Sequence, residues 1–317
     1  MSARQWVVLV VACVLPLVIG CSGTNGVGPP PAPGLEFVFD RVLGATGSGD
    51  GEFVAPSGIG ADAAGALYVA DTGNHRIQKL DADGAFAFAI GGEGSEAGRF
   101  RSPAAVAVSG SSVYVADTGN LRLQVFTADG GFVREFGSRW PEGGSLREPR
   151  ALVVGTSAVA VADGQQHRVV VYDMDGNVVR TLGALGNGDG EFLALRGLAL
   201  LGSTLYAVDA DRGDIQAFDL GTGGFLKTLG RMGSDLGELR SPTALAADGS
   251  GLWVLDNGNA RVQLLATSGA TQAVVRPART AAGSLVTPSG IAAWRGGFVV
   301  ADTGQDRLVS FKPKPDS

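Results

Sequence analysis

The pentapeptide Ala70-Asp71-Thr72-Gly73-Asn74 recurs as Ala116-Asp117-Thr118-Gly119-Asn120 and as Ala301-Asp302-Thr303-Gly304-Gln305. Degenerate copies lie between them, at Ala162-Asp163-Gly164-Gln165, Val208-Asp209-Ala210-Asp211 and Leu255-Asp256-Asn257-Gly258-Asn259. The steps between successive aspartates are 46, 46, 46, 47 and 46 residues. Self-similarity with a period of about 20–50 residues is typical of solenoids, propellers and arrays. The repeat therefore decides the fold class.

Each repeat contains four short strand-like runs. In the first repeat they cover residues 57–61, 67–70, 76–80 and 85–90, with turns between them that include Asp83-Gly84. Asp-Gly between two apolar runs is a strong hairpin signal. Four antiparallel strands in about 45 residues are typical of one blade of a β-propeller.

The composition agrees with many short strands joined by tight turns. The chain of 317 residues has 50 glycines, 45% apolar residues and only 18% charged residues. Its formal net charge of −6 argues against nonspecific binding to nucleic acid or to anionic lipid. We therefore expect no nucleic-acid partner.

The residues of the first two repeats resemble those of a known family. The run from Gly51-Glu52-Phe53 through Pro56-Ser57-Gly58-Ile59 to Asp71-Thr72-Gly73-Asn74-His75-Arg76 is similar to the NHL repeat, and Phe100, Pro103 and Arg122 continue the pattern in the second. The resemblance covers about residues 34–317. It implies an all-β, six-bladed β-propeller of four-stranded antiparallel blades. RNA-binding NHL domains present a basic face, whereas this chain is acidic.

The two ends of the repeat array predict a closed ring. The sixth repeat stops at Val309-Ser310-Phe311, at the end of its third strand. A spare fourth strand stands before the first repeat, at Phe39-Asp40-Arg41-Val42-Leu43-Gly44, and it resembles Phe132-Val133-Arg134-Glu135-Phe136-Gly137. Open solenoids instead carry polar caps. We therefore expect residues 36–44 to complete the last blade.

The N-terminus is predicted to be a targeting segment. An apolar run of signal-peptide length ends in Val18-Ile19-Gly20-Cys21, which resembles a bacterial lipobox. This predicts a signal peptide over residues 1–20, lipidation of Cys21, a Pro/Gly-rich tether over residues 21–34 and a propeller over residues 35–317. The alternative is an ordinary secretory signal with a chance cysteine. We expect an envelope lipoprotein of the outer membrane, periplasmic or surface-facing, that contacts the membrane only through its lipid.

The repeated aspartate is predicted to lie in the turn between the second and third strands of each blade. Its carboxylate can accept backbone N–H bonds and fix the turn, so we expect a structural role rather than a ring of acidic ligands. The six aspartates are Asp71, Asp117, Asp163, Asp209, Asp256 and Asp302. Five residues after each stands an arginine in every repeat except the fourth. We expect these arginines to pair with turn carbonyls or carboxylates; the alternative is an anion-binding ring.

The fourth repeat departs from the others. It has Leu195 where the others have proline, and Asp214 where the others have arginine. Asp209, Asp211 and Asp214 form an acidic turn, and Ca²⁺ prefers several oxygen ligands. Because no glycine-centred EF-hand loop is present, we predict no metal and no cofactor, with Ca²⁺ at this turn as the alternative.

The residue after each proline position is predicted to begin the innermost strand, at the mouth of the channel. These six residues are Ser57, Ala104, Arg150, Arg196, Thr243 and Ser289. Two close guanidinium groups on neighbouring blades would attract carboxylate or phosphate. The alternative is that Arg150 and Arg196 pair with Glu148 and Glu191.

Two further candidate ligand-binding residues stand near these arginines in the predicted fold. Trp140 belongs to an inter-blade loop, where an exposed tryptophan is a good contact residue; the alternative is that it covers the edge of the neighbouring blade. His167 belongs to the aspartate turn of the third repeat. We expect an anionic or acidic partner to dock across the third and fourth blades.

Enzyme signatures are mostly absent, so no catalytic residue is assigned. The chain has no G-x-S-x-G, G-x-G-x-x-G or P-loop motif. NHL-like amidating lyases use a histidine-rich zinc site, and the two histidines of this chain cannot supply one. We predict a noncatalytic, monomeric module that binds an unknown protein, peptide or glycan. The alternative is a metal-dependent lyase or hydrolase, lactonase-like, acting at the channel mouth.

Overall fold

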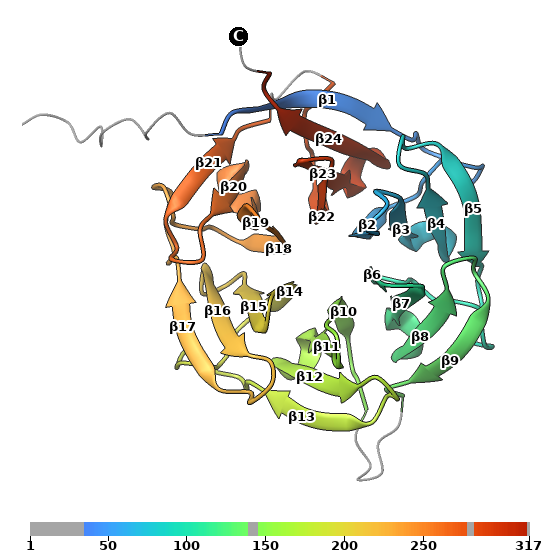
Figure 1. Cartoon of the computed structure of the whole chain (residues 1–317), viewed down its shortest axis with the longest axis horizontal. Helices are drawn as coiled ribbons and strands as arrows, with labels where there is room; N and C mark the ends of the chain where they lie inside the picture. The colour runs from blue at the N-terminus through green and yellow to red at the C-terminus, as the bar shows by residue number, and fades with distance from the viewer. Residues whose placement is uncertain (1–34, 139–144, 278–281, 316–317) are drawn as a thin grey trace, which may run out of the picture. The chain divides into compact units, whose positions relative to one another are not determined.

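A computed structural model describes residues 35–138, 145–277 and 282–315. Within these ranges the strands form six four-stranded sheets, which Figure 1 shows as blades around a common axis. In five of the sheets the four strands are consecutive in the chain and pair in chain order. The predicted all-β, six-bladed propeller of antiparallel blades is confirmed.

The blades repeat the same four strand positions. The innermost strands are β2 (Pro56–Ala61), β6 (Ala105–Ser109), β10 (Pro149–Val154), β14 (Leu195–Leu201), β18 (Pro242–Asp248) and β22 (Pro288–Trp294). The second strands are β3 (Leu67–Asp71), β7 (Ser112–Asp117), β11 (Ala158–Asp163), β15 (Thr204–Asp209), β19 (Gly251–Asp256) and β23 (Gly297–Asp302). The third strands are β4 (Arg76–Leu80), β8 (Arg122–Thr127), β12 (Arg168–Asp173), β16 (Asp214–Asp219), β20 (Arg261–Leu265) and β24 (Arg307–Pro313).

The outer strands close each blade, and short 3₁₀ turns follow most of the second strands. The outer strands are β5 (Phe86–Gly91), β9 (Phe132–Phe136), β13 (Val178–Leu182), β17 (Phe225–Leu229), β21 (Thr271–Val275) and β1 (Phe37–Leu43). The turns are η1 (Thr72–Asn74), η2 (Thr118–Asn120), η3 (Gly164–Gln166), η4 (Asn257–Asn259) and η5 (Thr303–Gln305). They lie where the sequence placed the aspartate turns.

Blade six is closed by the N-terminal strand. β1 pairs antiparallel with β24, with Phe39 opposite Phe311 and Leu43 opposite Leu308, and Figure 1 shows the blue β1 beside the red β24. The Phe37 ring packs edge-on against Trp253 of blade five, with ring centroids 4.8 Å apart. The predicted closure by residues 36–44 is therefore confirmed, and β1 also contributes to the seam between blades five and six.

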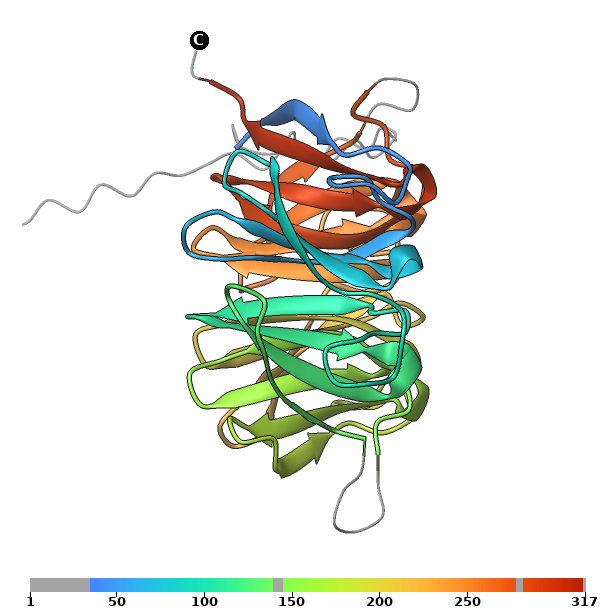
Figure 2. The ribbon, with the colours of Figure 1, turned by 90° about the vertical axis from the view of Figure 1, so that its right-hand side faces the viewer.

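The strands of each blade run between two faces of the ring, which appear at the left and right of Figure 2. The aspartate turns share one face with the inter-blade loops, because the turn and the loop bond to each other. In blade one the Gly73 N–H donates to the Val54 carbonyl, and in blade two the Gly119 N–H donates to that of Arg101. We call this end of the propeller the loop face.

The hydrophobic core lies in the six seams between neighbouring blades. Each buried cluster draws its residues from two adjacent sheets. Tyr68, Phe100 and Phe126, for example, meet between blades one and two, and the tilted rings of Trp253 and Phe298 pack against each other between blades five and six. Sheet-on-sheet packing around a ring leaves each innermost strand as the edge nearest the axis.

A periodic glycine ends the outer strand of several blades for a steric reason. Gly91 has a φ of 100°, and a Cβ there would lie 2.3 Å from the ring of Phe100. That ring belongs to the inter-blade loop and is fully buried. Gly183 stands in the same relation to Phe192. Only glycine satisfies both the left-handed backbone and the close approach of the ring.

Two of the predicted features fall outside the described residues. These are the N-terminal segment with its signal peptide, Cys21 and tether, and Trp140 in the loop between blades two and three. Over the residues that the structure describes, no helix is long and apolar enough to cross a membrane.

Candidate functional site at the channel mouth

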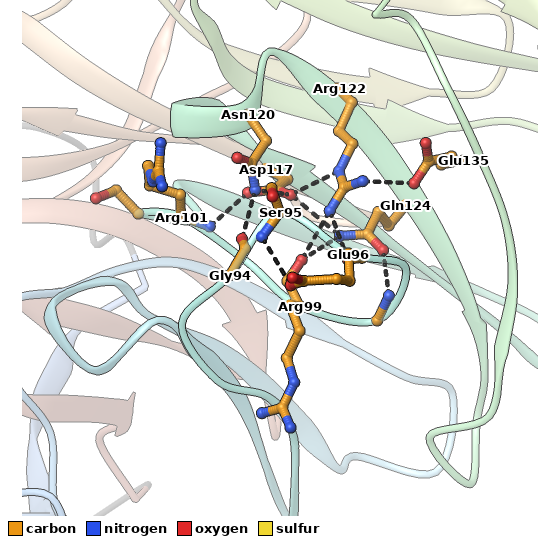
Figure 3. Close-up of polar contacts among 12 residues, drawn as sticks. Gly94, Ser95, Glu96, Arg99, Arg101, Asp117, Asn120, Arg122, Gln124 and Glu135 are labelled. Carbon is orange, nitrogen blue, oxygen red and sulfur yellow. Dashed lines mark hydrogen bonds and ion pairs between the residues drawn. The ribbon is translucent and has the colours of Figure 1, made fainter.

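The loop face is held together by a buried network around each repeated aspartate, shown for blade two in Figure 3. Asp117 is completely buried. It accepts hydrogen bonds from the Arg101 N–H at 2.8 Å, Asn120 Nδ2 at 2.8 Å, Arg122 Nε at 2.8 Å and Gln124 Nε2 at 3.0 Å. A buried carboxylate requires such compensation. The carboxylate thereby joins its own turn to the inter-blade loop.

The inter-blade loops adopt two conformations, which differ with the third residue after the aspartate. Blades one, two and five have asparagine there, and its side-chain amide donates a hydrogen bond to the aspartate carboxylate. In these blades the residue before the mouth proline adopts a left-handed φ of 44–48°, at Ala55, Ser102 and Ser241. In the other three blades that residue's N–H instead donates to the aspartate of its own blade, from Glu148, Ala194 and Thr287.

The arginines five residues after the aspartates form ion pairs inside this network. The Nε to carboxylate distance is 2.7–2.8 Å in blades one, two and five, and the nearest contact is 3.4–3.5 Å in blades three and six. Each guanidinium also donates to carbonyls of the inter-blade loop, as Arg122 does to Glu96 and Arg99. The hydrogen-bond donors of these arginines are thus used within the propeller, by the aspartates and the inter-blade loops.

Blade four has a similar ion pair, but its arginine lies in the turn and an aspartate takes the usual arginine position. Arg212 of the turn donates to Asp214 at 2.9 Å and to the Gly188 carbonyl, the counterpart of the Gly49 carbonyl that Arg76 binds in blade one. Burial raises the pKa of the Asp214 carboxyl, and the hydrogen bond from Arg212 opposes that shift. Asp209 accepts four backbone N–H bonds, from Leu193, Ala194, Asp211 and Arg212. Among the described residues no group of three or more His, Cys, Asp or Glu is placed to hold a metal ion.

A cavity of about 310 Å³ lies on the propeller axis. All six innermost strands line it, and nearly all the lining side chains are glycine, alanine, valine, leucine or isoleucine. Among the described residues, Arg150 and Arg196 are the only charged residues of the lining, and Thr243 and Ser289 the only hydroxyl residues. The predicted mouth positions in blades two to six therefore meet at one cavity, whose arginine-bearing end we call the channel mouth.

β-Bulges place the two arginines at this mouth. In blade three Pro149 pairs with Asp163 and Ala151 with Ala162, so that Arg150 is left as the extra residue. Arg196 is the extra residue of blade four in the same way. A bulge redirects the side chain of the extra residue. Each arginine directly follows the residue that pairs with the aspartate, so it belongs to the loop-face end of the strand.

The two arginines differ in their partners. Arg150 Nη2 donates to Glu148 Oε1 at 2.5 Å. Arg196 is half-buried and has no hydrogen-bond or ion-pair partner among the described residues. The carboxylate of Glu191 accepts the Gly188 N–H instead. Arg150 therefore pairs with Glu148, as the alternative prediction had it. Arg196 does not pair with Glu191.

The hydrogen bonds that link neighbouring blades around the mouth are interrupted beside blade four. In four seams the residue after the aspartate donates to the carbonyl at the proline position of the next blade, through Thr72, Thr118, Asn257 and Thr303. Blades three and four have Gly164 and Ala210 there, which carry no side-chain donor. A Cβ on Gly164 would lie 2.6 Å from Arg150 Cδ, so the arginine side chain occupies the space that a threonine fills elsewhere.

His167 lies outside the cavity lining, at the end of η3. Its counterpart His75 accepts the Ser102 N–H of the next blade through Nδ1 at 2.9 Å. In blade four the corresponding N–H, of Ala194, donates to Asp209. His167 Nδ1 is therefore buried without a hydrogen-bond partner among the described residues.

The sequence interpretation missed the interruption of the seam bonds, although the signal was present. The residue after the aspartate is Thr, Thr, Gly, Ala, Asn and Thr through the six repeats. The two copies without a side-chain donor are the two whose blades carry the mouth arginines. Comparing the residue after each aspartate with the residue at each mouth position would have linked the missing seam bonds to the mouth arginines.

Comparison with protein families finds the NHL repeat, whose family model matches residues 53–80 and 100–126. These segments contain the inner three strands of blade one and most of those of blade two. Protein brain tumor of Drosophila melanogaster is 37% identical over 73 residues, which are 23% of this chain and 7% of that protein. RING finger protein nhl-1 of Caenorhabditis elegans is 41% identical over 68 residues, 22% of this chain and 7% of that protein. The matched segments thus span less than a tenth of these relatives.

Solved structures share the fold at low sequence identity. A streptogramin B lyase structure has a TM-score of 0.62 at 15% identity, covering 88% of this chain and 98% of that one. A chain of a nidogen/laminin complex has a TM-score of 0.57 at 18% identity, covering 75% and 84%. The virginiamycin B lyase of Staphylococcus aureus with quinupristin has a TM-score of 0.60 at 14% identity, covering 88% and 100%. Likeness at this level shows the architecture.

Proposed function

We propose that this chain, a six-bladed β-propeller whose first two blades match the NHL-repeat model, is a noncatalytic binding module. Its partner is a protein, peptide or glycan that presents an anionic group to the channel mouth. A lipid on Cys21 would hold the propeller at the bacterial envelope, with residues 21–34 as the tether. The propeller would act there as a monomer.

One observation carries the binding proposal. Arg196 is a half-buried cation at the mouth of the axial cavity that has no partner among the described residues. The loop-face arginines such as Arg122 and Arg261 are saturated with carboxylate and carbonyl acceptors. A guanidinium held away from bulk water is a strong site for a planar anion.

The metal-dependent lyase or hydrolase alternative lacks support in the donor set. Within the part of the chain that the structure describes, the cavity lining contains no His, Cys, Asp or Glu, which are the side chains that hold catalytic metals. The lyase structures resemble this chain in fold at 13–15% identity, and fold alone does not carry an activity. We therefore develop the binding proposal.

The test is capture of a partner from envelope extract by the full chain, followed by measurement of its affinity for variants. We expect the double variant Arg150→Ala/Arg196→Ala to bind the captured partner at least about tenfold more weakly, because each charge-assisted bond contributes about 1.5–3 kcal/mol. Arg101→Ala is the control, since this exposed loop-face arginine does not line the cavity. A partner that binds the double variant as tightly as the parent chain would refute the proposal.

A further inference from the structure

We infer that the axial cavity binds a terminal carboxylate carried on a slender chain, with Arg196 as its principal partner and Arg150 beside it. This inference rests on the proposed function, because it names the anionic group that the channel mouth receives. The shared chemistry is that of a monocarboxylate. It has two sources, a free short acid or the C-terminus of a peptide.

The charge of the mouth favours a monoanion. Arg150 and Arg196 supply two positive charges to the cavity. Glu148 is hydrogen-bonded to Arg150 and contributes one negative charge. A single carboxylate brings the three groups to neutrality. A phosphate dianion would leave an excess negative charge beside Glu148, and like charges at short range repel.

The two guanidinium groups also offer different geometries. Arg150 is oriented by its bond to Glu148, and it lies across Gly164. Arg196 is free of such a bond among the described residues, so its planar fork is available for the two parallel bonds that a carboxylate accepts. Arg196 therefore supplies most of the affinity, and Arg150 adds a second positive charge.

The cavity limits what can follow the carboxylate. Its volume of about 310 Å³ is at the lower end of the range for small-ligand sites, which is roughly 300–1,000 Å³. The walls carry small side chains such as Ala105, Gly197 and Ala244. Each innermost strand is also a sheet edge, which leaves backbone N–H and C=O groups without a partner within the sheet. A chain end with one or two peptide groups matches both the size and the hydrogen bonding.

Matched probes test this directly in calorimetric titrations of the full chain. The first probe is N-acetyl-Gly-Gly-Ala with a free carboxylate, the second is the same peptide as its C-terminal amide, the third is propionate and the fourth is inorganic phosphate. We expect the free-acid peptide to bind at least about tenfold more tightly than the amide. Propionate that binds as well as the peptide identifies a free short acid as the source, and weaker propionate binding identifies a peptide C-terminus.

Three variants check the assignment of residues. Arg196→Ala should weaken binding of the free-acid peptide at least about tenfold. Glu148→Gln removes the negative charge of the Glu148 carboxylate beside Arg150, so it should strengthen phosphate binding more than peptide binding. Arg101→Ala, outside the cavity, should change neither, and circular dichroism and melting curves check that each variant is folded.

Several outcomes overturn the inference. They are equal binding of acid and amide, phosphate preferred over the carboxylate peptide by the parent chain, selectivity unchanged by Glu148→Gln, or no carboxylate binding at millimolar concentration. The proposed function fails separately, if a captured partner is indifferent to the loss of both arginines. A partner that needs the arginines while the acid and amide peptides bind alike would preserve the function and refute the carboxylate.

Discussion

Gly164 lies directly beneath the side chain of Arg150, so that a Cβ on the glycine would come within 2.6 Å of Arg150 Cδ and 2.7 Å of Nε. The backbone of Gly164 is not in the left-handed region, so conformational freedom does not explain the glycine. The space that the missing side chain leaves is filled by an arginine at the channel mouth. The glycine and the arginine therefore form one feature of blade three.

Substitution of Gly164 should move Arg150 without unfolding the protein. In Gly164→Ala the new methyl group takes the space of Arg150 Cδ and Nε, so the Arg150 side chain must move and its bond to Glu148 is disturbed. We expect a stability change below about 1 kcal/mol and a several-fold loss of affinity for a bound anion. Urea unfolding and titration with the carboxylate peptide measure the two effects. Gly249→Ala is the control, because nothing lies within 4 Å of a Cβ there; equal anion affinities in both variants would contradict the interpretation.

Exchange of Asn120 should convert one loop conformation into the other. Glutamine occupies the corresponding position in blades three and six, at Gln166 and Gln305. In Asn120→Gln we expect the Ser102 N–H to leave His75 and bond to Asp117, with Ser102 φ moving from 48° to a negative value. A crystal structure of the variant shows the result. Retention of the positive φ would show that the loop sequence, rather than the asparagine, sets the conformation.

The architecture was predictable because every blade repeats the same short turn and strand patterns. The Asp71 turn, the Asp83-Gly84 hairpin and the strand around Val42 are each readable in a short window of sequence. Period and strand count then fix the number of blades, and the spare first strand fixes the closure. The positions of the mouth residues followed from the same register.

The pairing within the site was not predictable from spacing alone. Arg150 and Arg196 occupy equivalent positions, and each has a nearby glutamate, Glu148 or Glu191. Glu148 accepts a hydrogen bond from Arg150, whereas the carboxylate of Glu191 accepts the Gly188 N–H of its own loop. The Arg212 and Asp214 exchange likewise depends on side-chain reach, which a one-dimensional pattern does not contain.

Loss of the closing strand should destabilise the ring. Phe37 packs against Trp253 and Phe298, with ring centroids 4.8 and 6.0 Å away. We expect Phe37→Ala to cost about 2 kcal/mol, less than the 3–5 kcal/mol of a fully buried phenylalanine because the ring is only half-buried. Val133→Ala, on an exposed outer-strand position, is the control. Deletion of residues 35–43 should lower the melting temperature further or cause aggregation through the unpaired edge of β24. An unchanged melting curve would contradict closure by β1.

The lipid on Cys21 is predicted from Val18-Ile19-Gly20-Cys21 and the proline-rich run that follows. In a bacterial host, Cys21→Ala should leave an uncleaved precursor or release soluble protein. Mass spectrometry of the mature N-terminus measures this, since a lipidated cysteine carries the mass of its acyl chains. A free, unmodified N-terminus after residue 21 would rule out lipidation and favour an ordinary secretory signal.

Burial of Asp214 in blade four should make stability depend on pH in a direction opposite to that of an aspartate whose pKa is lowered by folding. Burial raises the pKa of Asp214 above its ordinary value of 3.8. A group whose pKa is raised in the folded state adds stability at low pH, and this stability is lost as the pH rises through the folded pKa. Asp214→Asn cannot titrate. We therefore expect the parent chain to gain stability relative to this variant when urea unfolding is measured at pH 4 instead of pH 7.

Asp219 supplies a control with the reverse sign. The backbone N–H and the hydroxyl of Thr222 lower the pKa of this carboxyl, so its contribution is present at neutral pH and lost as the pH falls through the lowered value. The parent chain should therefore lose stability relative to Asp219→Asn only once the pH falls below 3.8, so urea unfolding of the parent chain and both variants is also measured at about pH 3. The two variants must move in opposite directions. If Asp214→Asn follows Asp219→Asn, the Arg212 ion pair rather than burial dominates Asp214, and the carboxylate is ionised in the folded state through this pH range.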